Sequence, residues 1–300
     1  MPENTETIVT AQSFKIEGPR KQGSPFDIDW RGIQSLSLGD LQSLEESAGL
    51  NQLVGRTVAV AIDAGRDFEV VSSFGSLRYE GCSVIRFQEP LPDAGRGLVS
   101  ALRGEAKEVR TVAGHDVFVF PDRVAMETVY RPKPWQGQFV SLPAPDTLLC
   151  ATSDRFLREV LERWGRPVPG KRALPPELQE WMHVDAMAPA WALRHVAKGP
   201  AHQGSLVGLT WCLKPQGREV FEVRYLPVQD QNVRFLADVW DNSMLEAHPA
   251  IEEKADGTMT VTVDCQKEAL NFWYLLLAHR SMGEQGIRGE YGPTGSEATP

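Results

Sequence analysis

The sequence predicts an α+β protein made of two related halves, each ordered strand-strand-helix-strand-strand-helix, with mainly antiparallel sheets and helices packed on one face. Segments rich in β-branched residues alternate with short amphipathic helical patterns. The order of these segments repeats along the chain, and Ile85-Arg86-Phe87 is similar to Val223-Arg224-Tyr225. The chain of 300 residues, 42% apolar and 24% charged, is long enough for one large domain or two modest ones.

The pattern divides the chain into five regions: an extended leader with a short helix (1–54), the first half (55–165), a Pro-rich linker (166–176), the second half (177–282) and a flexible tail (283–300). The leader is expected to hold a strand near Glu6–Thr10 and a helix at Leu38–Ser47. The linker is placed where Gly165–Pro176 contains four prolines and two glycines, which interrupt regular structure.

The first half is expected to contain a sheet and two helices. The strands are predicted at Thr57–Ile62, Leu77–Phe87, Gln138–Leu142 and Thr147–Cys150, with a hairpin over Val109–Phe120 that turns at Gly114-His115. One helix is predicted to be capped by Asp93 and to end at Gly104. The clearest helix is Ser153–Trp164, whose apolar residues recur at helical spacing between a Ser N-cap and the Gly165 stop.

The second half repeats this order with different lengths. The predicted elements are a helical turn after Pro175-Pro176, a helix at Ala188–Ala197, strands at Leu206–Leu213, Glu219–Leu226 and Thr258–Val263, and helices capped by Asp230 and Asp264, the latter spanning Gln266–Met282. Five of the eight tryptophans follow residue 180. We interpret them as an aromatic packing core, whereas an exposed subset would indicate a partner surface.

Charge and hydropathy exclude two classes of partner. Asp and Glu number 40 against 31 Lys and Arg, so the net charge is -9 and no basic block is present to grip a phosphate backbone. The most apolar stretch, Ala269–Ala278, is about half the length of a membrane span. The first fifteen residues lack the features of a signal peptide. We therefore expect a cytoplasmic protein, or an extracytoplasmic one if a leader has been removed.

The cysteines predict neither a zinc site nor a redox pair. Cys82, Cys150, Cys212 and Cys265 lie too far apart in the sequence for a CxxC motif, and we expect small buried thiols, with two disulfides as the alternative. Cys265, at the start of a predicted helix, would have a lowered thiol pKa, but no histidine lies near it in the sequence to activate it.

The densest group of chemically capable residues lies at His183, Asp185, Arg194, His195 and His202. Imidazole and carboxylate ligands suit zinc or iron, so His183, Asp185, His195 and His202 are the candidate metal ligands. The interpretation we favour is a polar packing seam in which these side chains bind neighbouring backbone or carboxylate groups. Walker A, GxGxxG, GxSxG and HExxH motifs are absent from the sequence.

The segment that carries this group, Arg172–His195, reads RALPPELQEWMHVDAMAPAWALRH. It resembles a family of bacterial proteins with the pattern R-A-L-P-x-x-L-x-E-W-x-H-V-D…W-A-x-R-H, to which no activity is assigned. Tyr79-Glu80-Gly81-Cys82, Pro143–Thr152 and Val207-Gly208-Leu209 extend the resemblance. It implies no cofactor and no catalytic residue, and members often carry an N-terminal leader.

The sequence therefore predicts a non-enzymatic binding or protein-interaction module, because a catalytic signature is absent and the second half is rich in aromatic residues. Its partner, a protein or a small molecule, stays open, as does the oligomeric state. The alternative is a metal-assisted or general acid–base hydrolase that uses His183, Asp185, Arg194 and His195. A stoichiometric subunit of a larger assembly is a third hypothesis.

Overall fold

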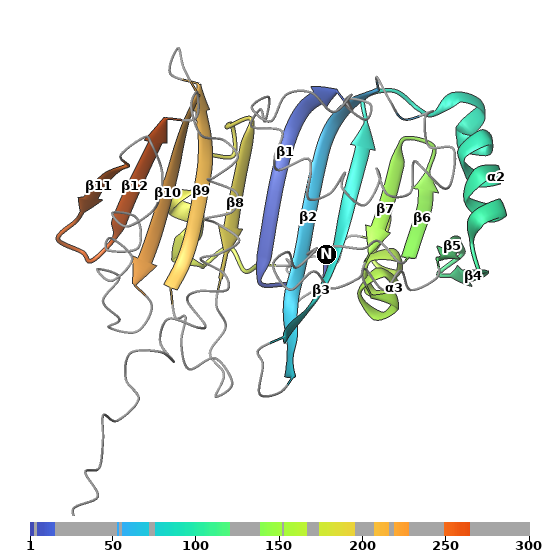
Figure 1. Cartoon of the computed structure of the whole chain (residues 1–300), viewed down its shortest axis with the longest axis horizontal. Helices are drawn as coiled ribbons and strands as arrows, with labels where there is room; N and C mark the ends of the chain where they lie inside the picture. The colour runs from blue at the N-terminus through green and yellow to red at the C-terminus, as the bar shows by residue number, and fades with distance from the viewer. Residues whose placement is uncertain are drawn as a thin grey trace, which may run out of the picture.

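A computed structural model describes residues 1–2, 5–15, 53, 56–71, 76–120, 139–151, 153–166, 174–195, 207–215, 219–227 and 249–264. These residues form one antiparallel sheet of twelve strands, in the order β11-β12-β10-β9-β8-β1-β2-β3-β7-β6-β5-β4 (Figure 1). Among these residues, no helix is long and apolar enough to cross a membrane. The antiparallel α+β character predicted from the sequence is confirmed.

The strand β1 (Thr7–Lys15) lies at the centre of this sheet and joins its two sides. On one side it pairs with β2 (Thr57–Val71), where Thr10 lies opposite Ile62. On the other side it pairs with β8 (Ala190–Arg194), where Thr10 lies opposite Trp191. The predicted strand near the N-terminus is therefore confirmed. Its pairing with β8 joins residues that lie farther apart in the sequence than those of any other strand pair in the described sheet.

The remaining strands extend outward from this centre. On the first side they are β3 (Ser76–Phe87), β7 (Thr147–Ala151), β6 (Phe139–Ala144), β5 (His115–Val119) and β4 (Glu108–Val112). On the second side they are β9 (Val207–Pro215), β10 (Glu219–Pro227), β12 (Met259–Asp264) and β11 (Ala250–Glu253). The four-residue strand β11 was not predicted, because its sequence AIEE lacks β-branched alternation.

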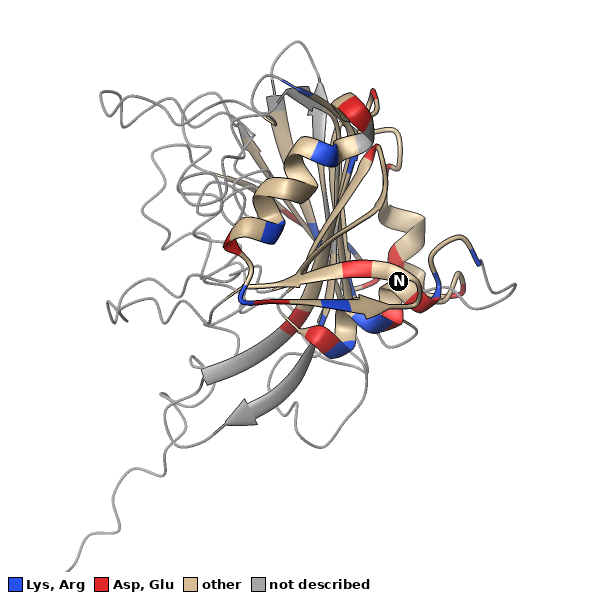
Figure 2. Ribbon diagram, turned by 90° about the vertical axis from the view of Figure 1, so that its right-hand side faces the viewer, with Lys and Arg blue, Asp and Glu red and all other residues tan. Residues whose placement is uncertain are grey.

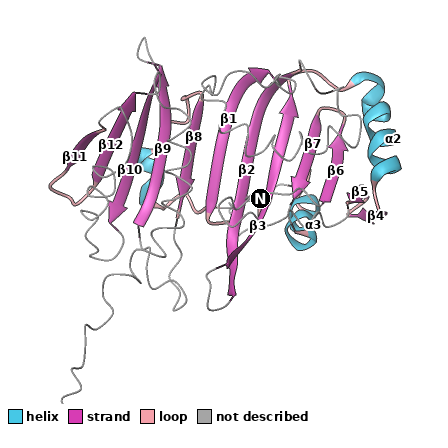
Figure 3. Ribbon diagram, in the orientation of Figure 1, coloured by secondary structure: helices cyan, strands magenta, loops and turns pink. Residues whose placement is uncertain are grey.

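The two helices described in the first half pack on opposite faces of the sheet, not on one face as predicted, because their buried residues belong to two separate core clusters. In Figure 3 one of these helices lies in front of the sheet and the other lies beside its outer strands, and Figure 2 shows the latter to one side of the strands. The helix α2 (Arg96–Glu105) follows the 3-10 turn η2 (Pro92–Gly95) and buries Leu98 and Leu102 against one face. The helix α3 (Asp154–Glu162) buries Phe156 and Leu157 against the other. Both faces need cover because β7 is buried along its whole length, so successive apolar side chains point both ways.

Local predictions succeeded where capping and periodicity agreed. The backbone N–H of Phe156 donates to Ser153 Oγ at 3.4 Å, which confirms the predicted N-cap of α3. The predicted cap of the preceding helix is wrong: Asp93 lies within η2, and its side chain does not cap α2. The N-cap of α2 is Gly95, whose φ of 76° is left-handed. The hairpin between β4 and β5 turns at Ala113-Gly114, one residue earlier than predicted, with both residues at positive φ as a type I′ turn requires.

The predicted helix at Ala188–Ala197 is wrong, because this segment contains β8. Its local composition favours a helix, but pairing with β1 and β9 places it at the centre of the sheet, where Ala190, Ala192 and Leu193 are buried. The helical turn predicted after Pro175-Pro176 is present as η3 (Gln179–His183). Cys82, Cys150 and Cys212 are buried, as expected.

Several predictions fall outside the described residues. These are the helix at Leu38–Ser47, the helices capped by Asp230 and Asp264, most of the linker, the tail 283–300, Cys265 and His202.

Candidate functional site

The structure brings His183 and His195 to one face of the second half, and each has its own surroundings. His195 follows β8, and its Nδ1 lies 2.7 Å from Glu180 Oε1 on η3. His183 ends η3, and its Nδ1 lies 3.2 Å from Arg224 Nη1 on β10. Arg194 ends β8, opposite Thr7 in β1. Each histidine thus contacts a side chain of another element, His195 on the preceding η3 and His183 on the more distant β10.

Asp185 is directed to a local turn. Its Oδ1 accepts from the backbone N–H of Met187 at 3.0 Å, an Asx turn in an exposed segment. Within the described residues, no group of three or more His, Cys, Asp or Glu side chains is placed to hold a metal ion. This geometry gives Asp185 a structural task in shaping the segment between η3 and β8.

Sequence reasoning missed Glu180, Glu222 and Arg224. Glu180 is 1% exposed and faces His195, while Arg224 Nη2 lies 2.7 Å from Glu222 Oε1. The signal was available in β10, where Glu222 and Arg224 alternate with Phe221, Val223 and Tyr225. Period-two alternation places the two charged residues on the face opposite to the apolar ones.

The polar face of the second half includes buried side-chain atoms without a hydrogen-bond partner from the chain. Those found among the described residues are Glu180 Oε2, Trp191 Nε1, Thr210 Oγ1, Arg224 Nε and Thr260 Oγ1. Thr210 and Thr260 lie directly opposite Arg224 on the two strands that flank it. A buried polar group left unpaired costs about 1–3 kcal/mol. Each of these atoms that stays unpaired therefore lowers the stability of the folded protein.

The protonation of His183 follows from its neighbours. Burial lowers the pKa of His183, and the positive charges of Arg224 and Lys254 lower it further, against the opposing effects of Asp256 and Glu180. The imidazole is therefore neutral at pH 7. Because Arg224 can only donate, Nδ1 of His183 accepts and the ring proton is on Nε2.

Two exposed methionines flank this polar face on the segment 174–189, which we call the η3 segment. Met182 is 78% exposed and Met187 is 89% exposed. Beside them, the rings of Trp181 and Trp191 meet edge to face at 6.0 Å, and Trp181 Nε1 donates to the Pro175 carbonyl at 3.0 Å. Trp181 and Trp191 are half-buried and pack against each other locally, whereas the side chains of Trp211, Trp240 and Trp273 lie outside the described residues, so the predicted aromatic core stays a prediction.

Comparisons with known proteins find no relative that shares this arrangement. No family model matches the chain, and no curated protein or solved structure is significantly similar to it. The resemblance carried by Arg172–His195 stays an expectation.

Proposed function

We propose that this protein is a non-enzymatic interaction module that contacts a partner protein through the η3 segment. The observation that carries the proposal is the exposure of Met182 and Met187, at 78% and 89%, on a segment packed against the sheet. Methionine is flexible and polarisable, and it is used at protein-binding surfaces for that reason. Met182 and Met187 leave apolar side-chain surface in contact with water, and a partner protein would bury it.

The η3 segment is anchored, which favours binding. The backbone N–H of Gln12 in β1 donates to the Pro189 carbonyl at 2.8 Å, and its side chain donates to the Ala186 carbonyl at 3.3 Å. Ala188 N–H donates to the Asp185 carbonyl at 3.0 Å. A contact surface that is already ordered loses less conformational entropy when a partner binds.

The negative charge of the η3 segment and of the whole chain favours a partner with a basic surface. Glu177 and Asp185 are exposed on the η3 segment, and the chain has a net charge of -9. The complementary surface is an apolar pocket that receives the methionine side chains and is rimmed by Lys or Arg. Charge complementarity of this kind raises association rates and makes them sensitive to salt.

The test uses matched surface variants. The partner is first captured from an extract of the source organism, and its purified form is then titrated against the wild type and a Met182→Ser/Met187→Ser variant. We expect the double variant to bind at least about tenfold more weakly. Val109→Ser serves as the control, since Val109 is 37% exposed on β4 at the far end of the sheet. Equal affinity of all three proteins would overturn the proposal.

A second candidate function is the general acid–base hydrolase. It is favoured by the short contact between His195 Nδ1 and a carboxylate that is 1% exposed, because a buried carboxylate can fix the tautomer of an imidazole that acts as a base. Its test is hydrolysis of a panel of activated esters. Turnover by the wild type that His195→Ala abolishes would support the hydrolase and count against a non-enzymatic module.

We also propose that the two halves arose by duplication. The order β2-β3-β7-β6 outward from the centre corresponds to β9-β10-β12-β11, and Arg86 lies opposite Thr147 as Arg224 lies opposite Thr260. At equivalent register, apolar Val84 of the first half corresponds to Glu222, which supports a polar site specific to the second half. Superposition of the halves in an experimental structure should place Arg86 on Arg224; a register offset would contradict the duplication.

A further inference from the structure

The sheet ends in the first half at the strand β4, on the side of the molecule that faces the viewer in Figure 2. Within the part of the chain that the structure describes, β4 pairs with β5 alone. Its residues are exposed apart from half-buried Arg110 and buried Val112, so this edge of the sheet is open to solvent. An open edge presents backbone donors and acceptors with which another strand can pair.

The hairpin turn determines which backbone groups of β4 point outward. Because a two-residue turn joins β4 to β5, Val112 at the end of β4 forms hydrogen bonds with β5. Hydrogen-bonded and non-hydrogen-bonded positions alternate along an antiparallel strand, so Glu108 and Arg110 also bond to β5. The N–H and C=O groups of Val109 and Thr111 therefore point away from β5, toward the open edge.

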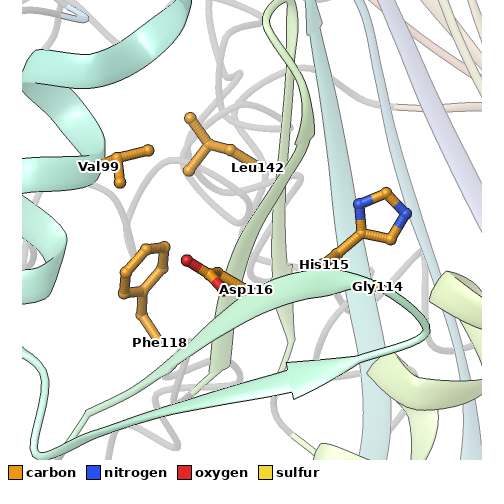
Figure 4. Close-up of a pocket in the computed structure, with 6 residues that line it drawn as sticks. All are labelled: Val99, Gly114, His115, Asp116, Phe118 and Leu142. Carbon is orange, nitrogen blue, oxygen red and sulfur yellow. The ribbon is translucent and has the colours of Figure 1, made fainter.

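The two faces of β4 differ in character. Arg110 lies on the face covered by α3, where its Nη1 is 3.6 Å from Asp154 Oδ1, and its Nε is 2.8 Å from Glu108 Oε1. Val109 lies on the other face, because it is paired with Phe118, whose ring lines the open hollow beside α2 (Figure 4). Val109 is 37% exposed, one of three exposed large apolar side chains among the described residues. The edge thus carries one apolar residue between a negative and a positive one.

We propose that β4 pairs with β4 of a second copy of this chain, antiparallel and centred on Val109. In this register the two copies of Val109 form a hydrogen-bonded pair, and their side chains meet at the two-fold axis. Glu108 of each copy then faces Arg110 of the other, so opposite charges meet across the strand pair twice. A pair centred on Arg110 would instead place two arginines opposite each other, which destabilises a strand pair. This self-complementary order of charges favours a second copy over an unrelated strand.

The pairing is weak, because one short strand buries little surface. Interfaces below about 1,200 Å² are typical of transient contacts, so we expect a Kd of about 0.1 mM. Sedimentation velocity of the full chain from about 10 µM to 1 mM should therefore show a monomer giving way to a dimer. Added salt should weaken the dimer, since salt screens exposed ion pairs. At the lower concentrations used for unfolding and titration, the chain is a monomer.

Three variants test the register. Glu108→Arg makes both facing charges positive and Arg110→Glu makes both negative, so either variant alone should stay monomeric at about 1 mM. Mixed in equal amounts, the two should form a dimer of wild-type strength, because every introduced charge then faces an opposite one. Val109→Pro removes an N–H that points outward and none of the donors to β5, so this variant should also stay monomeric.

The control is the Met182→Ser/Met187→Ser variant, whose substitutions lie in the second half and which should dimerise like the wild type. Melting temperatures establish that each variant is folded. The proposal is overturned if the wild type stays monomeric over the whole concentration range, if both charge variants dimerise, or if their mixture does not. A dimer lost in the methionine variant would place the contact on the η3 segment and would also overturn pairing through β4.

Discussion

Replacing Glu80 by Gln tests how the first half holds α3 against the sheet. Glu80 on β3 is 4% exposed and lies at the centre of a charged network. Its Oε2 receives Arg66 Nε at 3.0 Å and Arg155 Nη2 at 2.7 Å, and its Oε1 accepts from Ser153 Oγ at 2.8 Å. The network therefore ties β2, β3 and the N-terminus of α3 together.

The expected loss of stability depends on the arginine charges that the substitution leaves buried. Removing one partner of a buried ion pair costs about 3–5 kcal/mol, since the other charge stays buried. Arg66 is 4% exposed but also binds Glu159 at 2.8 Å, so it is not left without a countercharge. We therefore expect a loss of about 3 kcal/mol, the lower end of that range. At roughly 2 °C per kcal/mol for a chain of this size, the melting temperature should fall by about 6 °C.

The pH dependence has a defined sign. Burial opposes ionisation of Glu80, but hydrogen bonds from Arg155, Ser153 and Arg66 outweigh it and lower the pKa of the carboxyl below its ordinary value of 4.5. The stabilisation is therefore fully present above about pH 4.5 and is lost as the pH falls through the lower pKa of the folded state. The difference between wild type and Glu80→Gln should shrink over that acidic range.

Urea unfolding monitored by tryptophan fluorescence, repeated from pH 3 to pH 8, measures both effects. Glu108→Gln is the matched control, because Glu108 also pairs with an arginine but is exposed on β4. The control should unfold at the urea concentration of the wild type. Equal unfolding midpoints for Glu80→Gln and Glu108→Gln would refute the reasoning.

Three further predictions concern the backbone, the polar face and the central strand. Gly95→Ala places a Cβ 3.3 Å from a side-chain carbon of Leu142 at a φ of +76°, so it should lower the free energy of unfolding by about 1–2 kcal/mol in a urea titration. Gly104→Ala, whose new Cβ has nothing within 4 Å, should instead stabilise α2 by up to about 1 kcal/mol. His183 has a lowered pKa and binds Arg224 only when neutral, so the protection factors for hydrogen exchange in the η3 segment, measured relative to the intrinsic rate at each pH, should fall below about pH 6.5 in the wild type but not in His183→Gln. Thr10→Pro should abolish cooperative unfolding by circular dichroism, because proline disrupts a strand paired on both sides.

The elements that sequence reasoning placed correctly are those whose signals are local. The helix α3 has a serine cap, an apolar stripe and a glycine stop within fourteen residues or so, and all three agree. The segment of β8 shows the opposite case. AWALR has good helix formers, and its pairing with β9 and with β1, whose residue Thr7 lies opposite Arg194, makes it a strand. Long-range pairing of this kind leaves no local trace.

The candidate site was predicted in part for the same reason. His183 and His195 were found because their residue types stand out in the sequence. Glu180 and Arg224 were not, because their importance comes from contacts between η3, β8 and β10. Alternation in β10 indicates which face Arg224 occupies, but no local pattern indicates that a histidine forty residues earlier covers it.

The central position of β1 has a consequence for synthesis on the ribosome. Residues 7–15 are synthesised well before their partner strand β8, which ends at Arg194. At about 5–20 residues per second, roughly 10–40 s pass between the two. During that interval one edge of β1 has no partner from β8, and an open strand edge is a template for pairing with another chain. The nascent first half is therefore the stage at which this protein is most exposed to aggregation, and slower translation would lengthen the exposure.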